Sequence, residues 1–164
     1  MFRRLISSLF IVGILSGCNT DADGIVDQVG RRVVDDAVVL TSQQQISLTK
    51  VVKEIDVKHN AEFVVYTLKR IPDTSNIEEF SNKVFNKWKI GKKESDSGLL
   101  FVVSTQDRKI RIEVGRGNEG NMPDAVAGDI IRNVMAPNFR AGKYYEGLLE
   151  GIRAAEKVVT KEGK

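Results

Sequence analysis

Residues 98–114, with the sequence GLLFVVSTQDRKIRIEV, decide the fold of this chain. The first part, residues 99–103, is uniformly apolar, which is typical of a strand buried on both faces of a sheet. The last part, residues 109–114, is apolar at every even position and charged at every odd one, which predicts a half-exposed edge strand. Because the polar residues 105–108 between them suit a turn, the two strands are expected to form a hairpin.

Two strand-and-helix pairs are expected upstream of this hairpin. An apolar run within residues 33–40 suits a leading strand, and residues 63–68, FVVYTL, predict a second strand buried on both faces. Between them, the capping-box pair Ser42 and Gln45 is expected to start a helix, and Asn60 is expected to end it. The buried stripe of this helix follows the i, i+3, i+4, i+7 pattern in Leu48, Val51, Val52 and Ile55.

Helices are also expected on both sides of the hairpin. Ser75 with Glu78 predicts the start of one helix before the hairpin, and Gly91 its end. The apolar face of that helix consists of Ile77, Phe80, Val84 and Trp88. After the hairpin, one helix is expected to end at Pro137 and the last to start near Lys143. The order strand-helix-strand-helix-strand-strand-helix-helix predicts an α/β sandwich of about four strands covered on both faces.

Composition excludes several classes of function. The 164 residues suggest one domain with a short appendage. The formal net charge is only +3, and no run of basic residues is interleaved with aromatic residues. A nucleic-acid partner is therefore not expected. A single cysteine and a single histidine can form neither an internal disulfide nor a Cys/His metal cluster. We expect that histidine, His59, to be a solvated or capping residue rather than a catalytic base.

The first eighteen residues have the pattern of an export signal. Arg3 and Arg4 make a positive start, and residues 5–15 form an apolar stretch that is shorter than the roughly 20 residues needed to span a bilayer. Residues 15–18, LSGC, resemble a bacterial lipobox, in which the cysteine receives a diacylglycerol and cleavage occurs just before it. An ordinary signal peptide with an incidental cysteine, or an uncleaved anchor, is the alternative.

These features predict a lipoprotein of the bacterial cell envelope. Residues 1–17 are expected to be a lipoprotein signal peptide, Cys18 the lipidated residue, and residues 18–32 a tether. Acyl chains on Cys18 would hold the domain at the membrane, facing the periplasm or the outside of the cell. Asn19, rather than aspartate, follows the cysteine, which favours sorting to an outer membrane where one exists.

Four segments together resemble one known family. These segments are WKIG at 88–91, DSGLLFVV at 96–103, DRKIRIEVGRGNEG at 107–120 and PNFRAGKYYEG at 137–147. They resemble the TPM domain, and we expect that domain to cover residues 33–160. The sequence departs from the family in reading Asp96-Ser97-Gly98 for the usual Asp-Asn-Gly, and in lacking the membrane helix and glycine-rich tail that end many members.

The resemblance implies a Rossmann-like three-layer α/β/α sandwich in an exported or lumenal protein that is often tethered to a membrane. Members of the family are linked to photosystem repair, to receptor modulation and, for some, to phosphatase activity or calcium binding. No single reaction defines the family, so the resemblance does not establish whether this chain is an enzyme.

Residues 115–120, GRGNEG, match the GxGxxG pattern of dinucleotide-binding loops. That pattern belongs in a first βαβ unit with an acidic residue after a second strand, whereas two helices are expected to follow here. We therefore expect no dinucleotide cofactor and interpret the glycines as serving a tight bend.

Three carboxylates near this loop are the candidate catalytic and metal-binding residues: Asp96, Glu119 and Asp124. Their oxygens would suit Ca²⁺ or Mg²⁺, and Arg116 is the candidate for holding a phosphate against such a metal. The alternative is that Asp124 favours a helix dipole and Asp96 shapes a turn.

The leading hypothesis is a binding, assembly or maintenance module for membrane-protein complexes, with a membrane partner through the lipid anchor and an envelope protein partner. A metal-dependent phosphatase using the acidic residues is the second hypothesis. A calcium-stabilised structural domain without catalysis is the third.

Overall fold

The sheet contains the predicted hairpin and two further parallel strands. A computed structural model describes residues 22–28, 30–73, 75–91 and 95–160. Its strands are β1 (Val33–Asp35), β2 (Glu62–Leu68), β3 (Gly98–Ser104) and β4 (Lys109–Val114). They lie in the order β1-β2-β3-β4, with β1, β2 and β3 parallel and β4 antiparallel to β3. Every residue of β3 is buried, so the predicted central strand and its edge neighbour are both confirmed.

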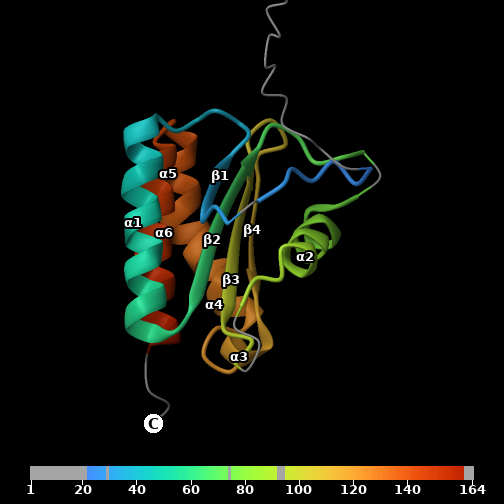
Figure 1. The fold of residues 1–164 in the computed structure, drawn as a ribbon. Coiled ribbons are helices and arrows are strands. Elements are labelled where there is room, and N and C mark those ends of the chain that lie inside the picture. Colours follow the sequence, from blue (N-terminus) through green and yellow to red (C-terminus); the bar gives the residue numbers. More distant parts are fainter. Residues whose placement is uncertain (1–21, 29, 74, 92–94, 161–164) are drawn as a thin grey trace, which may run out of the picture.

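Helices cover both faces of this sheet (Figure 1). They are α1 (Ser42–His59), α2 (Ile77–Lys87), α3 (Arg116–Glu119), α4 (Asp124–Ile130), the π-helical segment η1 (Ile131–Met135), α5 (Ala136–Arg140) and α6 (Tyr144–Val159). In Figure 1, α2 lies on one side of the sheet, and α1, α5 and α6 lie on the other. The predicted three-layer α/β/α sandwich is therefore confirmed. The helix α1 connects the parallel strands β1 and β2, and α2 connects β2 and β3. Because these two helices cover opposite faces of the sheet, the two connections have opposite hands, and one of them departs from the usual right-handed rule.

Each face of the sheet has its own hydrophobic core. Phe63, Val65 and Phe101 pack against Leu48 and other residues on the side of α1 and α6. On the other side, the core beneath α2 consists of Val34, Val64, Tyr66, Leu68, Leu100 and Val102 with Ile77, Phe80, Val84, Ile25 and Val26. Alternation along β2 and β3 thus sends successive side chains into different cores, which explains their continuous apolar sequence.

The predicted tether is partly incorporated into the domain. Ile25 and Val26 are 1% and 2% exposed, and the Trp88 indole Nε1 donates to the Val26 carbonyl at 3.2 Å. The tether at residues 18–32 stays a prediction, and the structure adds that this pair of residues packs into the core beneath α2. Two adjacent apolar residues have no periodicity, so the sequence pattern could not show that the core beneath α2 includes them.

The starts of the first two long helices differ slightly from the expectation. Thr41, not Ser42, is the N-cap of α1, with Gln44 completing the capping box. Thr41 and Ser42 each have a glutamine three residues later, so the capping-box pattern alone does not show which of them is the N-cap. Thr41 has the extended backbone of an N-cap residue, with φ −69° and ψ 159°. At α2 the N-cap is Asn76, whose side chain accepts from the Glu79 amide at 2.8 Å.

The helix expected to end at Pro137 continues through it. The Ala136 amide donates to the Ile131 carbonyl, which is the wider hydrogen-bond spacing of a π-helix. Pro137 then lies in the first turn of α5, where the amide hydrogen that proline lacks is not required. The π-helical segment is therefore the physical reason why the proline does not end the helix.

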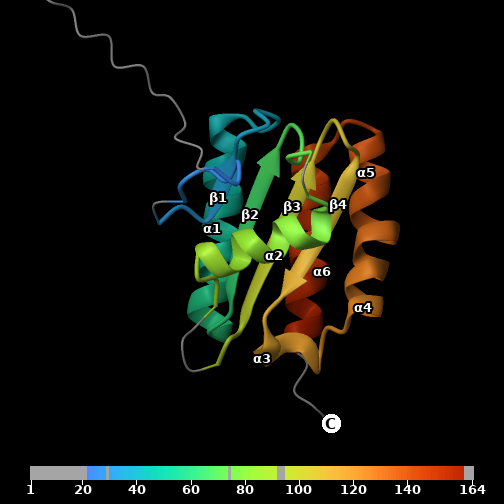
Figure 2. The ribbon, with the colours of Figure 1, turned by 90° about the vertical axis from the view of Figure 1, so that its right-hand side faces the viewer.

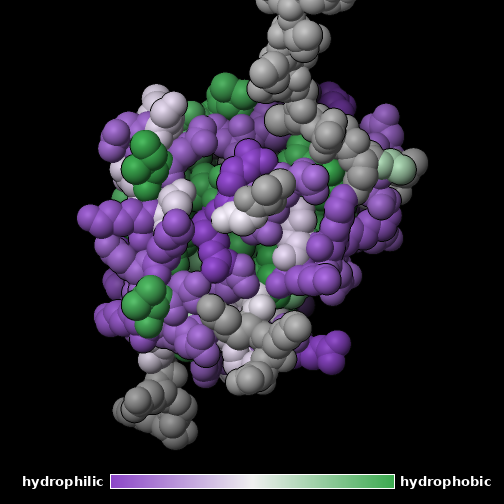
Figure 3. Space-filling view, in the orientation of Figure 1, coloured by the Kyte–Doolittle hydropathy of each residue, from purple (hydrophilic) through white to green (hydrophobic). Residues whose placement is uncertain are grey.

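The face of the molecule seen in Figure 3 is mostly hydrophilic, with a few hydrophobic patches. Two of these patches lie over α1, whose Ile46 and Val57 are 62% and 89% exposed. Within the described residues, no helix combines the length and the apolar composition needed to cross a membrane.

Candidate functional site

The structure places the predicted acidic residues at the end of the sheet where α3 lies, the lower end in Figure 2. Asp96 lies in the loop before β3, with its Oδ2 4.0 Å from Nε of Arg116. Asp124 is the first residue of α4, and its exposed carboxylate lies 3.4 Å from Nη2 of Arg111. Glu119 is exposed at the end of α3. The two aspartates therefore face different arginines.

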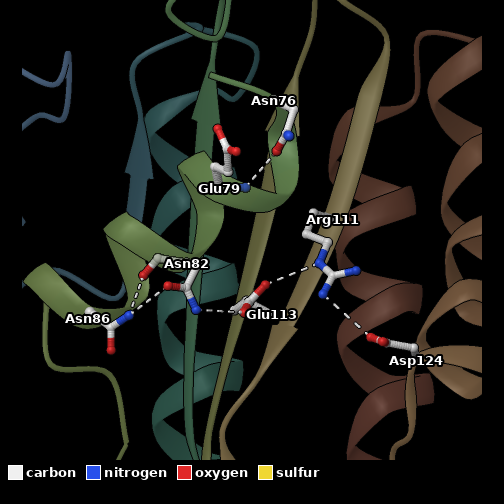
Figure 4. Close-up of polar contacts among 7 residues, drawn as sticks. All are labelled: Asn76, Glu79, Asn82, Asn86, Arg111, Glu113 and Asp124. Carbon is white, nitrogen blue, oxygen red and sulfur yellow. Dashed lines mark hydrogen bonds and ion pairs between the residues drawn. The ribbon is translucent and has the colours of Figure 1, made fainter. Parts of the chain in front are cut away.

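Arg111 joins Asp124 to the α2 face through a chain of polar contacts (Figure 4). Its Nε donates to Glu113 at 3.1 Å, and the other carboxylate oxygen of Glu113 accepts from Asn82 of α2 at 3.3 Å. Arg111 and Glu113 are the charged residues of the alternating strand, so the exposed face expected for β4 carries this network. Its contacts suit the docking of α2 and α4 on β4.

The described residues contain no group of three histidine, cysteine, aspartate or glutamate side chains that could hold a metal ion. The metal site on Asp96, Glu119 and Asp124, and the phosphate-binding role of Arg116, remain predictions.

The glycine-rich loop forms α3 and packs tightly against the loop that contains Asp96. A Cβ on Gly115 would lie 2.2 Å from the Asp96 carbonyl oxygen, and one on Gly117 would lie 1.8 Å from that of Ser95. Gly115 has an ordinary φ of −69°, so the interpretation that these glycines serve a tight bend is corrected. They are needed because two backbone segments approach too closely for any side chain.

A separate pocket lies at the opposite end of the sheet, where β3 ends and β4 begins. Its volume is about 580 Å³. The lining residues come from the β3–β4 hairpin, α5 and the turn before α6: Val103, Ser104, Thr105, Arg108, Lys109, Ile110, Ala136, Phe139, Arg140, Gly142 and Tyr144. Three of these are cationic and none is acidic. The pocket is therefore suited to an anionic ligand, and sequence analysis did not identify it.

The hairpin side of the pocket is fixed by bonds to the end of β2. The amides of Thr105 and Gln106 donate to the carbonyls of Leu68 and Lys69 at 3.0 and 2.9 Å. Asp107 accepts from the Ser104 hydroxyl at 2.6 Å and from the Ile71 amide at 2.7 Å. These two hydrogen bonds, the first most of all, hold the pKa of the Asp107 carboxyl below its ordinary value.

Aromatic rings and the start of α6 form the other side of the pocket. Phe139 stacks on Tyr144 with ring centroids 5.3 Å apart. Lys143, the N-cap residue of α6, provides no side-chain cap, so amides in the first turn remain available to a ligand. Basic residues at 108, 109 and 140 were visible in the sequence, but only the fold brings them into one pocket.

One remaining candidate from the sequence, His59, can be placed. His59 Nε2 lies 3.4 Å from the Glu156 carboxylate, linking the end of α1 to α6. Cys18 and the signal segment lie outside the described residues.

Comparison with known proteins identifies the domain. The sequence pattern of the TPM domain matches residues 33–158. A solution NMR structure of the N-terminal domain of a P. gingivalis protein is 38% identical, covers 78% of this chain and 81% of its own, and has a TM-score of 0.71. The BA42 protein of the psychrophilic bacterium Bizionia argentinensis is 20% identical, with coverages of 74% and 82% and a TM-score of 0.66.

A third structure, the N-terminal domain of a Corynebacterium glutamicum protein, is 12% identical, with coverages of 82% and 84% and a TM-score of 0.62. At their low identities this structure and the Bizionia structure show the fold alone. No curated protein is significantly similar to the chain.

Proposed function

The chain belongs to the TPM-domain family, and from that premise we propose that it is a lipid-anchored envelope protein that binds and helps to assemble or maintain membrane-protein complexes. The anchor would be Cys18, on the strength of the lipobox-like residues 15–18. The domain would face the periplasm or the outside of the cell.

The observation that carries this proposal is the outer face of α1. Ile46 and Val57 are exposed on this helix, and Lys50 and Lys53 lie between them at i+4 and i+7 from Ile46, on the same side. Neither lysine has an ion-pair partner among the described residues. A surface on which two unpaired lysines lie between exposed apolar side chains suits a protein partner whose surface combines apolar and acidic groups.

Site-specific crosslinking in cells tests the proposal. A photo-crosslinking residue at Val57 should capture an integral membrane protein, and the same residue at the exposed Glu78 of α2 should not. Lys53→Glu should abolish that crosslink, because it reverses one charge of the binding face. Lys157→Glu, an equal charge change on exposed α6, is the matched control and should leave it intact.

The anchor has its own test. Cys18→Ser should move the protein from the membrane fraction to the soluble fraction and remove the crosslink. An unchanged distribution, together with an unmodified thiol by mass spectrometry, would disprove the lipoprotein assignment.

The phosphatase alternative is tested on the same purified protein. Turnover of p-nitrophenyl phosphate that requires Mg²⁺ or Ca²⁺ and disappears in Asp96→Asn would replace the binding proposal with an enzymatic one.

A further inference from the structure

The loops at the carboxyl ends of β1, β2 and β3, together with the turn between α5 and α6, form what we call the carboxyl edge: residues 36–41, 69–73, 105–108 and 141–143. We propose that this edge faces the membrane and that its pocket binds the phosphate of an anionic phospholipid headgroup. The inference rests on the lipid anchor proposed above and adds a second, non-covalent contact with the bilayer.

The length of the tether indicates which end of the domain faces the membrane. Gly24 lies at the carboxyl edge, because a Cβ on it would be 2.9 Å from Pro72, in the loop after β2. Gly24 is six residues after Cys18, and these six steps of the chain can span at most about 21 Å. The 18-residue α1, which runs along the sheet, is about 27 Å long. A lipidated Cys18 therefore reaches the bilayer more easily from this edge than from the end that carries α3.

Basic residues outnumber acidic ones at the carboxyl edge, when Lys109 and Arg140, which adjoin it, are included. Six exposed basic residues lie there: Lys69, Arg70, Arg108, Lys109, Arg140 and Lys143. The acidic residues of the same loops are Asp36, Asp73 and Asp107, and Asp35 adjoins them at the end of β1. Asp107 is engaged by Ser104 and Ile71, as described above. Each lysine or arginine beside an anionic membrane strengthens binding roughly fivefold, so this excess of positive charge favours acidic lipids.

Within the edge, the pocket offers several unused hydrogen-bond donors. Arg108 and Arg140 have no ion-pair or hydrogen-bond partner among the described residues, and neither does the Tyr144 hydroxyl. The uncapped first turn of α6 directs its positive dipole end to the same place. Glu146 in that turn opposes an anion, but it is exposed and does not line the pocket. Guanidinium groups, a hydroxyl and helix amides together suit a phosphate.

Apolar groups beside the pocket suit the rest of a lipid. Val103, Ile110 and Phe139 line it next to the cationic residues. Val38, in the loop after β1, is 77% exposed although its backbone has the left-handed φ of 56°. A hydrophobic patch stands over this β1–α1 loop at the top of Figure 3. An exposed valine at an edge with an excess of basic residues suits contact with the bilayer interface.

Vesicle sedimentation with the full-length Cys18→Ser protein tests the inference without any acyl anchor. Vesicles of phosphatidylcholine mixed with phosphatidylglycerol should bind the protein, and vesicles of phosphatidylcholine alone should not. Arg140→Gln should weaken binding about tenfold, because it removes one charged donor to the phosphate. Lys157→Gln removes an equal charge from exposed α6 and should weaken binding about twofold or less.

Two further measurements separate the pocket from general surface charge. Tyr144→Phe removes a hydroxyl without changing charge and should weaken binding severalfold. Soluble glycerol phosphate should compete with the vesicles for the protein. Equal binding to both kinds of vesicle, or equal loss in Arg140→Gln and Lys157→Gln, would overturn the inference. So would an unchanged affinity in Tyr144→Phe combined with no competition by glycerol phosphate. Melting curves by circular dichroism confirm that each variant is folded.

The outcomes for the anchor and for the pocket are independent. Since the vesicle protein carries no lipid, failure to bind phosphatidylglycerol leaves the Cys18 fractionation and the α1 crosslink unaffected. Conversely, a soluble wild-type protein would refute the anchor even if isolated vesicles were bound.

Discussion

Gly117→Ala should lower the free energy of unfolding of this domain, whereas the same change at Gly120, three residues later, should not. The new Cβ at 117 would lie 1.8 Å from the Ser95 carbonyl oxygen, whereas real Cβ atoms essentially never come within 3.0 Å of another heavy atom. The loop containing Ser95 must therefore move by at least 1.2 Å, the difference between these two distances. At Gly120 a Cβ has no neighbour within 4 Å, and its φ of −62° suits alanine.

The cost at Gly117 follows from what that movement breaks. The Gly117 amide donates to the Asp96 carbonyl at 3.2 Å, and the Gly115 amide donates to Gly98 at 2.8 Å. Losing one or both backbone hydrogen bonds and disturbing the packing around buried Met122 should cost about 2–4 kcal/mol of unfolding free energy. Gly120→Ala should instead stabilise the protein by about 0.4–1 kcal/mol, because alanine restricts the unfolded chain.

Urea unfolding measures the difference between these two variants. The chain has one tryptophan, Trp88, which packs against the core beneath α2, so its fluorescence reports on folding together with circular dichroism. Equal stability of Gly117→Ala and Gly120→Ala would refute the close approach of the two backbone segments. A rise in melting temperature on adding NAD would contradict the expectation that this loop binds no dinucleotide.

Three further predictions concern the pocket hairpin, a strained loop and the segment before β1. Asp107→Asn should destabilise the protein at neutral pH. Because folding lowers the pKa of Asp107, its carboxylate stabilises the protein fully above the unfolded pKa near 3.8. This stabilisation is lost as the pH falls through the lowered folded pKa, so the unfolding free energies of wild type and variant should converge in acid. Val38→Gly should remove the strain of a left-handed valine, which destabilises the folded protein by about 1–2 kcal/mol. After the greater flexibility of glycine in the unfolded chain is subtracted, the melting temperature should rise by about 2–4 °C. An unchanged or lower melting temperature would argue against that conformation. Ile25→Ala should cost about 2–4 kcal/mol in urea unfolding, whereas Val57→Ala, at an exposed position, should stay within about 0.5 kcal/mol; similar values for both would place residue 25 outside the core.

The sequence predicted the sheet and its helical layers because burial imposes repeating patterns on it. The uniform apolarity of residues 99–103 and the alternation of 109–114 correspond to a central and an edge strand. The family resemblance came from the same region and was confirmed over residues 33–158. The helix stripes were also largely correct, although the start of α1 was placed one residue late. The N-cap of α2 is one residue later than predicted, and the helix ends at Lys87 rather than at Gly91.

Tertiary structure decided what no local pattern expresses. Pro137 remains inside a helix because a π-helical segment precedes it, and Gly115 and Gly117 are required by a loop some twenty residues earlier in the chain. The second outcome depends on two backbone segments that are far apart in the sequence and adjacent in the fold.

The candidate pocket shows the same division between sequence and fold. Its basic residues at 108, 109 and 140 are ordinary surface residues in the sequence, separated by about thirty positions. They share one cavity because the β3–β4 hairpin and the α5–α6 turn meet at the same end of the sheet. The sequence patterns indicated most of the buried strand and helix residues, although not Ile25 and Val26. Only the packing of α5 and α6 on the sheet brings these charged side chains around a common space. The physical reason is that burial acts on each residue separately, while a binding site depends on contacts between residues far apart in the chain.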